Sequence, residues 1–147
     1  MPYCTVRVAG RNEYDRLGGL YARWGYRGGI LTTDVAYVAE RAGEIVGLVR
    51  RTEEFGYTML RGMYVDPIHQ RRGVGMTLLQ ALVDGLGASE CLCVPLAHLV
   101  RFYGAGGFAP LPLERAPPFL VERSAQYRAE GLDVLVMRRA PDAGQPS

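Results

Sequence analysis

The sequence predicts a mixed α/β or α+β fold, in which a sheet carries helices on both faces. Segments with the alternating pattern of strands and segments with the 3.6-residue pattern of helices follow one another in mixed order. The chain has 147 residues, of which 48% are hydrophobic and 22% charged, which suits one globular domain with a sizeable core. We therefore expect a single domain over residues 1–139, followed by a flexible C-terminal tail over residues 140–147.

The N-terminal part of the chain predicts a strand, a helix and a glycine-rich loop. Tyr3–Val8 alternates as a strand does, and Asn12 is a candidate N-cap for the helix that follows. One face of this helix carries Tyr14, Leu17, Leu20, Tyr21 and Trp24. Gly25–Gly29 interrupts the helical pattern and predicts a loop.

The next part of the chain predicts three consecutive strands. A hairpin is expected from Val35–Arg41 and Glu44–Arg51, joined by a turn at Ala42-Gly43. A second turn around Glu53–Gly56 leads to a strand over Tyr57–Val65. Asp66-Pro67 ends that strand, because proline cannot donate to the ladder.

The C-terminal half predicts further helices and strands in alternation. The first is a helix that Gly87 ends, with apolar or small residues at helical spacing at Gly75, Leu78, Leu79, Leu82 and Leu86. A buried strand is expected at Cys91–Val94, followed by a helix from Leu96 to Tyr103. A further helix runs from Pro117-Pro118 to Arg128, and a closing strand is expected over Leu132–Arg138.

The composition excludes several classes of chemistry. All seventeen basic residues are arginine, so the chain has no lysine for a Schiff base, a lysine general base or a P-loop. No serine stands in G-x-S-x-G, which excludes a nucleophile-elbow hydrolase. The net charge of +2 is too small to predict a nucleic-acid partner.

Cysteine usage and hydropathy predict a cytoplasmic protein without a membrane partner. The chain has three cysteines, no secretory signal pattern and no apolar run near the ~20 residues that a spanning helix needs. Cys91, Cys93 and His98 lack a fourth ligand at zinc spacing, so we expect buried thiols and no metal.

The segment from Met63 to Met76 carries the clearest chemical signal. A predicted strand runs into a short loop that opens a helix at Gly73, where unpaired N–H groups and the helix dipole attract an anion. Gly73 and Gly75 lack a Cβ, and Arg71 and Arg72 add cationic donors. The pattern is typical of a pyrophosphate cradle; a tight turn without a ligand is the alternative.

Four elements together resemble the GNAT superfamily of N-acetyltransferases, one of them the strand end Met63-Tyr-Val-Asp-Pro67 before the loop. Gln70-Arg-Arg-Gly-Val-Gly75 is similar to its Q/R-x-x-G-x-G/A signature. Phe102-Tyr-Gly-Ala-Gly-Gly-Phe108 resembles its F-Y-x-x-x-G-F motif, and Gly43-Glu-Ile-Val-Gly47 its hairpin signal. The resemblance covers residues 36–108 and implies a central, mixed, mostly antiparallel sheet of six to seven strands with helices on both faces.

The resemblance also implies acetyl-CoA as co-substrate and places its binding site. Main-chain groups of Met63 and Val65, on either side of Tyr64, would pair with the pantetheine arm. N–H groups of the loop and helix start would hold the pyrophosphate. The residues implied in cofactor binding are Met63, Tyr64, Val65, Gln70, Arg71, Arg72, Gly73, Val74, Gly75 and Met76.

Tyr103 matches the tyrosine that protonates the departing CoA thiolate in this family. A phenol with a pKa of ~10 is a suitable weak acid for that step. Two positions depart from the family pattern, since Leu96 stands where asparagine is frequent and Leu99 where alanine is. A contact of the Leu96 side chain with pantetheine is therefore not expected.

The general base stays unassigned. Met59 occupies the strand position at which some members carry a carboxylate, and Glu53 and Glu54 are expected at a solvated hairpin tip. His98 is expected to be packed or exposed rather than catalytic.

The resemblance is compatible with two functions, an acetyltransferase and a non-catalytic binding module. The favoured reading is transfer of an acetyl group to a primary amine by direct attack in a ternary complex, with a small molecule preferred over a protein N-terminus. A non-catalytic acyl-CoA-binding module is the alternative, and a homodimer remains open. Specificity residues are expected in two regions, around Tyr21, Trp24, Tyr26 and Arg27 and around Phe119, Leu120 and Tyr127.

Overall fold

A computed structural model describes residues 2–141 of the chain. By their internal contacts the residues form two compact units, Met1–Gly85 and Leu86–Ser147. The single domain expected over residues 1–139 stays a prediction. Most of the predicted tail over residues 140–147 lies outside the described residues.

The first unit contains a four-stranded antiparallel sheet and two helices. Its elements are β1 (Thr5–Val8), η1 (Arg11–Glu13), α1 (Tyr14–Arg23), β2 (Val35–Arg41), β3 (Glu44–Glu54), β4 (Tyr57–Val65), η2 (Pro67–His69) and α2 (Val74–Leu86), whose last residue belongs to the second unit. The strands lie in the order β1-β2-β3-β4, and each pairs with the next one in antiparallel direction.

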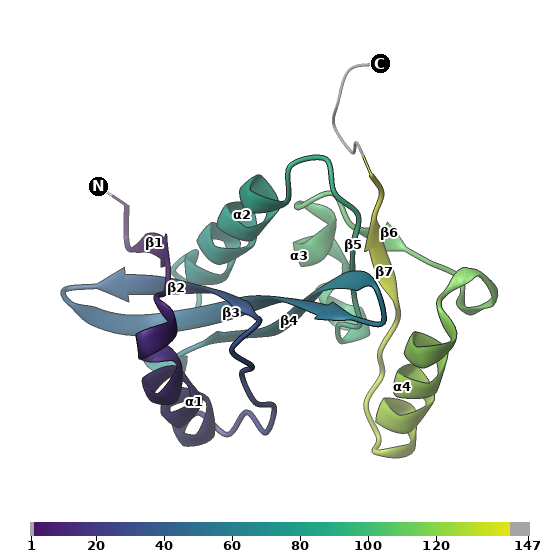
Figure 1. The fold of residues 1–147 in the computed structure, drawn as a ribbon, viewed down its shortest axis with the longest axis horizontal. Coiled ribbons are helices and arrows are strands. Elements are labelled where there is room, and N and C mark those ends of the chain that lie inside the picture. The colour runs from purple at the N-terminus through teal and green to yellow at the C-terminus, as the bar shows by residue number, and fades with distance from the viewer. Residues whose placement is uncertain (1, 142–147) are drawn as a thin grey trace. The chain divides into compact units, whose positions relative to one another are not determined.

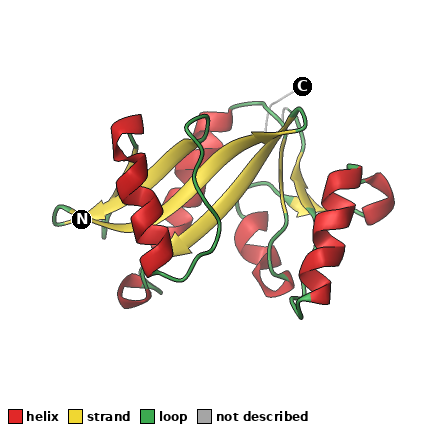
Figure 2. Ribbon diagram, turned by 60° about the horizontal axis from the view of Figure 1, so that its bottom comes forward, coloured by secondary structure: helices red, strands yellow, loops and turns green. Residues whose placement is uncertain are grey.

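Helices α1 and α2 lie on opposite faces of these strands (Figures 1 and 2). The buried face of α1 joins one core cluster, whose members include Tyr14, Leu17, Leu20, Tyr21, Ala36, Val38 and Leu48. On the other face, Gly47 of β3 lies against Val74 and Leu78 of α2. The predicted apolar face of the first helix is thereby confirmed, with Trp24 half-buried at its end.

Asn12 is not the helix cap that the sequence predicts. It lies inside the 3-10 turn η1, and no side chain caps α1. The carboxylate of Glu13 instead accepts a hydrogen bond of 2.8 Å from the N–H of Gly10 and binds Arg7 at 2.7 Å. The carboxylate of Glu13, rather than the side chain of Asn12, thus forms the hydrogen bond to the backbone of this turn.

Both predicted hairpins are present, and the second is longer than expected. The turn residues Ala42 and Gly43 have φ of 51° and 81°, and Phe55 and Gly56 have 52° and 82°, the left-handed pair that matches strand twist in two-residue hairpins. The second turn therefore contains only Phe55 and Gly56. Glu53 and Glu54, expected in the turn, are the last residues of β3.

The second unit contains three short antiparallel strands and two α-helices. Its elements are β5 (Cys91–Cys93), η3 (Ala97–Leu99), α3 (Val100–Gly104), β6 (Ala109–Pro110), η4 (Leu113–Arg115), α4 (Pro118–Ala129) and β7 (Met137–Arg139). Strand β7 lies between β5 and β6. The helix expected from Leu96 begins as a 3-10 turn, and β6 was not predicted.

The closing strand expected over Leu132–Arg138 is wrong over most of its length. Only Met137–Arg139 is a strand, and Val134 forms an isolated bridge with Leu96. The neighbouring segment contains Pro95, which accepts from the N–H of Leu135 at 3.2 Å but has no N–H to donate. The ladder therefore cannot continue through this region.

Seven strands and four α-helices within residues 2–141 confirm the mixed α/β fold with mostly antiparallel strands. In the same residues, no helix is long and apolar enough to cross a membrane.

Candidate active site

A β-bulge in β4 shapes the start of the predicted cofactor segment. Leu48 pairs with Tyr64 and Arg50 with Arg61, so one residue of β3 faces two of β4, Gly62 and Met63. Gly62 has a φ of 67°, which glycine adopts without strain. Its carbonyl accepts a hydrogen bond of 2.7 Å from the hydroxyl of Tyr21 on α1. The bulge therefore turns the backbone at Gly62–Met63 out of the regular ladder.

The side chain of Tyr64 is bound on the α1 side of the sheet. Its hydroxyl donates to the carbonyl of Trp24 at 2.7 Å, and the two rings stack with centroids 5.4 Å apart and an interplanar angle of 10°. Tyr64, which lies between the two residues predicted to pair with pantetheine, thus has its side chain committed to α1.

The loop between β4 and α2 is held near the end of β4 by two side-chain hydrogen bonds. The side chain of Asp66 accepts from the N–H of Ile68 at 3.1 Å, and the amide of Gln70 donates to the carbonyl of Val65 at 3.1 Å. Arg71 and Gly73 have φ of 64° and 82°. The Gln70 side chain therefore fastens the loop back onto β4, which is a structural use of a residue predicted to contact the cofactor.

The N-terminus of α2 meets the geometric requirement for an anion site. Its first helical bond is from the N–H of Thr77 to the carbonyl of Gly73, at 3.0 Å. By helix geometry, the N–H groups of Val74, Gly75 and Met76 then have no acceptor within the helix. A Cβ on Gly73 would meet open space, and Arg71 and Arg72 are exposed beside it. The residues present therefore fit a pyrophosphate.

Tyr103 lies on α3 of the second unit and is 5% exposed. Its ring packs edge-on against Phe102 and Phe108, with centroids 4.9 Å and 6.2 Å away. Burial raises the pKa of the Tyr103 phenol above its ordinary value, and the nearby Cys93 adds to this. The phenol therefore keeps its proton at neutral pH.

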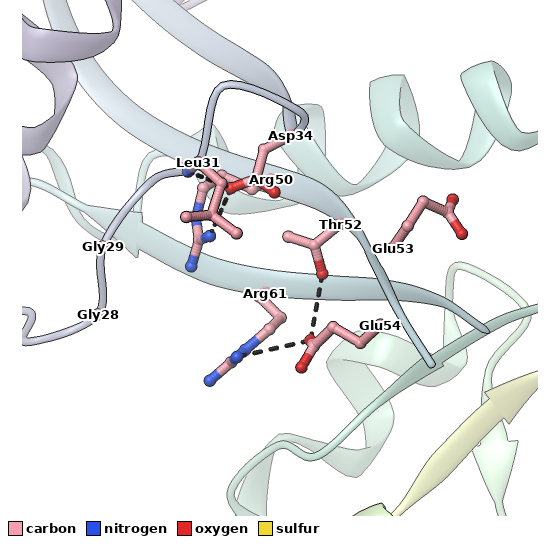
Figure 3. Close-up of a pocket in the computed structure, with 9 residues that line it drawn as sticks. All are labelled: Gly28, Gly29, Leu31, Asp34, Arg50, Thr52, Glu53, Glu54 and Arg61. Carbon is pink, nitrogen blue, oxygen red and sulfur yellow. Dashed lines mark hydrogen bonds and ion pairs between the residues drawn. The ribbon is translucent and has the colours of Figure 1, made fainter. Parts of the chain in front are cut away.

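A cavity opens on the α1 side of the sheet in the first unit (Figure 3). It has a volume of about 200 Å³. Its walls come from the loop after α1 and from the adjoining ends of β3 and β4, and consist of Gly28, Gly29, Leu31, Asp34, Arg50, Thr52, Glu53, Glu54 and Arg61. Since a water molecule takes about 30 Å³ of liquid volume, this space suits a small molecule or one side chain.

A buried ion pair forms one wall of the cavity. Arg50 and Asp34 are 5% and 2% exposed and approach to 2.9 Å. Arg50 also donates to the hydroxyls of Tyr21 and Tyr26, at 3.3 Å and 2.9 Å. Because its hydrogen bonds are directed to these groups, Arg50 is a fixed part of the wall.

The opposite wall carries a carboxylate that the sequence placed at a solvated hairpin tip. Glu54 is half-buried, accepts from the hydroxyl of Thr52 at 3.3 Å and lies 3.5 Å from Arg61. Glu53 points away from this group (Figure 3). Its carboxylate accepts a hydrogen bond of 2.8 Å from the hydroxyl of Thr58. The period of two along β3 from Arg50 to Glu54 is the signal that could have found this residue.

Three further candidates of the sequence, His98, Cys91 and Cys93, lie in the second unit. His98 is exposed on η3, and Cys91 and Cys93 are buried cysteines in the thiol form, as expected. Burial raises the pKa of Cys93, which disfavours a reactive thiolate. Within residues 2–141, no group of three His, Cys, Asp or Glu side chains could hold a metal ion.

Comparison with known proteins identifies the family. Residues 32–110 match the family described as "Acetyltransferase (GNAT) domain". This match spans more than half of the chain, and it includes the cavity residues of β3 and β4, the bulge, the loop, α2 and Tyr103. The chain belongs to the GNAT acetyltransferases, a class of acyl-CoA-dependent enzymes.

Solved structures show the same fold at low sequence identity. The chain is similar to a Corynebacterium glutamicum protein described as "histone acetyltransferase HPA2 and related acetyltransferase", with a TM-score of 0.67, 15% identity, and 95% of this chain and 97% of that one covered. The ribosomal-protein-S18-alanine N-acetyltransferase of Escherichia coli gives a TM-score of 0.65 at 15% identity, covering 94% and 93%. Rv2747 of Mycobacterium tuberculosis, solved with CoA, gives 0.65 at 14% identity, covering 92% and 98%.

Proposed function

We propose that the protein transfers the acetyl group of acetyl-CoA to the primary amine of a small molecule, by direct attack within a ternary complex. The observation that carries the cofactor part is the open N-terminus of α2, with Gly73 in the left-handed region and Arg71 and Arg72 beside it. Val74, Gly75 and Met76 would donate their N–H groups to the pyrophosphate. Main-chain groups of Met63 and Val65, on either side of Tyr64, would pair with the pantetheine arm, as the family resemblance implies.

The acceptor amine would enter the cavity on the α1 side. The small volume and the half-buried carboxylate of Glu54 support a small cationic amine there. We assign Glu54 as the group that binds the ammonium and takes its proton, directly or through one water molecule. Thr52 and Arg61 fix the carboxylate, since both bind it.

In the reaction, the neutral amine attacks the thioester carbonyl and forms the new C–N bond, and the proton that its nitrogen then loses passes to water. By the family resemblance, an N–H near Met63, beside the bulge, would face the carbonyl oxygen, where negative charge develops. The C–S bond then breaks, and Tyr103 donates its proton to the thiolate that leaves. A phenol whose pKa is raised by burial holds this proton over the physiological pH range.

Calorimetric titration with acetyl-CoA tests the cofactor site. The wild type should bind saturably, and Gly75→Glu should abolish binding, because its carboxylate would meet the pyrophosphate at the start of α2. The melting temperature of the variant is the control for folding. Absence of binding to folded wild-type protein would refute the proposed cofactor site.

Release of CoA from acetyl-CoA with a panel of small primary amines tests turnover. Tyr103→Phe should bind acetyl-CoA as the wild type does, while kcat falls by about tenfold or more, because the general acid is lost. Equal kcat in the variant would remove the role of Tyr103. Wild-type protein that binds acetyl-CoA but acetylates no amine would favour a binding module.

A further inference from the structure

Tyr3, at the start of the chain, joins two segments that are distant in the sequence. On one side it contacts the β2–β3 hairpin: the Cζ atom of Arg41 lies 3.8 Å from the Tyr3 ring centroid, and the Arg41 guanidinium donates to the Tyr3 carbonyl at 2.6 Å. A guanidinium over an aromatic face is attracted by the ring quadrupole. The ring and the main chain of Tyr3 are therefore both held by one arginine.

On the other side, Tyr3 contacts the loop between β4 and α2. A hydrogen bond of 2.6 Å links its hydroxyl to Nδ1 of His69, and the two rings are 5.9 Å apart. The Cζ atom of Arg72 lies 6.0 Å from the same Tyr3 centroid. Tyr3 thus contacts the loop at two positions, one of which is a proposed pyrophosphate ligand.

We propose that Tyr3 is a positioning residue for acyl-CoA, which acts through the loop and Arg72. An exposed arginine loses side-chain freedom when it binds a phosphate, and a partner that already restricts it reduces this loss. Tyr3 restricts Arg72 through its ring and the loop through His69. The inference rests on the proposed function, because it requires that the loop binds pyrophosphate.

Substitution of Tyr3 tests the role through its effect on acyl-CoA binding. Tyr3→Ala should raise the Kd and the KM for acetyl-CoA about three- to tenfold, the range expected for one cation–π contact and one hydrogen bond, and leave kcat unchanged. Tyr3→Phe keeps the ring and loses the bond to His69, so its effect should be smaller. Thr5→Ala, an exposed change in the same N-terminal segment, is the matched control and should change neither constant.

A double-mutant cycle with Arg72→Ala separates positioning from general destabilisation. If Tyr3 acts through Arg72, Tyr3→Ala should have much less effect on the Kd in the Arg72→Ala background than in the wild type. Full additivity would overturn the coupling, and a fall in kcat at unchanged KM would overturn the positioning role. Wild-type protein that fails to bind acetyl-CoA would refute the proposed function itself, whereas wild-type binding with Tyr3→Ala unaffected would refute this inference alone.

Discussion

Glu54 illustrates how a single residue acquires a role from the length of its strand. Because β3 continues to Glu54, the side chains of Arg50, Thr52 and Glu54 alternate onto the cavity side, and Glu54 reaches Arg61 on β4. A strand that ended at Arg51, as the sequence predicted, would have left the carboxylate in a turn. The sequence therefore did not reveal Glu54 as a base, because the end of a strand is hard to locate where the residues before the turn are polar.

At this scale we predict that Glu54→Gln lowers kcat by about a hundredfold with a small effect on the Kd for acetyl-CoA, because the group that accepts the amine proton is lost. The remaining rate should rise with pH as more of the amine is unprotonated in solution. Steady-state kinetics from pH 6 to 9 measures both effects.

Glu53→Gln is the comparison for this experiment, since the Glu53 carboxylate is directed to Thr58 and away from Arg61. Its effect should be at least tenfold smaller than that of Glu54→Gln. Equal effects of the two variants would point to the charge of the cavity rather than to a base.

At the scale of elements, the bulge in β4 depends on one glycine. A Cβ at Gly62 would overlap the Tyr21 hydroxyl, and φ of 67° would strain any other residue. Burial raises the pKa of Tyr21, so this hydroxyl remains a neutral donor to the Gly62 carbonyl. At Gly62, β4 and α1 thus lie so close that only a glycine leaves room for the Tyr21 hydroxyl.

We expect Gly62→Ala to lower the free energy of unfolding by about 3 kcal/mol, from backbone strain and the clash with Tyr21. Urea unfolding measures this change. Gly56→Ala is a matched control, because Gly56 has a φ of 82° but open space around its missing Cβ, and it should cost about 1 kcal/mol. A Gly62 variant as stable as the Gly56 variant would show that Tyr21 and α1 move to accommodate the added methyl group.

Local patterns predicted some elements well and others poorly. Strands β2 and β4 have the predicted bounds and β3 begins where predicted, because alternation and left-handed turn residues agree there, whereas β3 continues three residues past its predicted end. Strand β6 has two residues, too few for any periodicity, and the segment before β7 alternates without a complete partner beside it. In the candidate site, glycines and arginines marked the loop, whereas the cavity depends on contacts between distant segments that no local pattern contains.

At the scale of the whole molecule, charged residues contribute stability that depends on pH. The hydrogen bond from Arg7, with that from the Gly10 N–H, lowers the pKa of Glu13 to about 2. A carboxylate with a depressed pKa stabilises the fold fully above its unfolded pKa of ~4.3, and this contribution is lost as pH falls toward 2. The ion pair is partly exposed, so its contribution is about 0.5 kcal/mol.

Glu13→Gln should therefore be less stable than the wild type at pH 6, and this difference should disappear as the pH approaches 2. Urea unfolding of both proteins at several pH values measures the difference. Glu122→Gln, an exposed change on α4, should show no such dependence. A constant difference at all pH values would mean that the Glu13 side chain stabilises the fold by packing.

The arginines that line the cavity have one more consequence. An enzyme that holds an activated acyl group next to nucleophilic nitrogens is at risk of modifying itself. Both cations in the cavity wall, Arg50 and Arg61, carry guanidinium groups, which stay protonated and are poor nucleophiles, and the chain has no lysine. The pocket thus orders its carboxylates with positive charge and offers no ε-amine of its own, so its walls would not compete with the acceptor amine proposed to bind there.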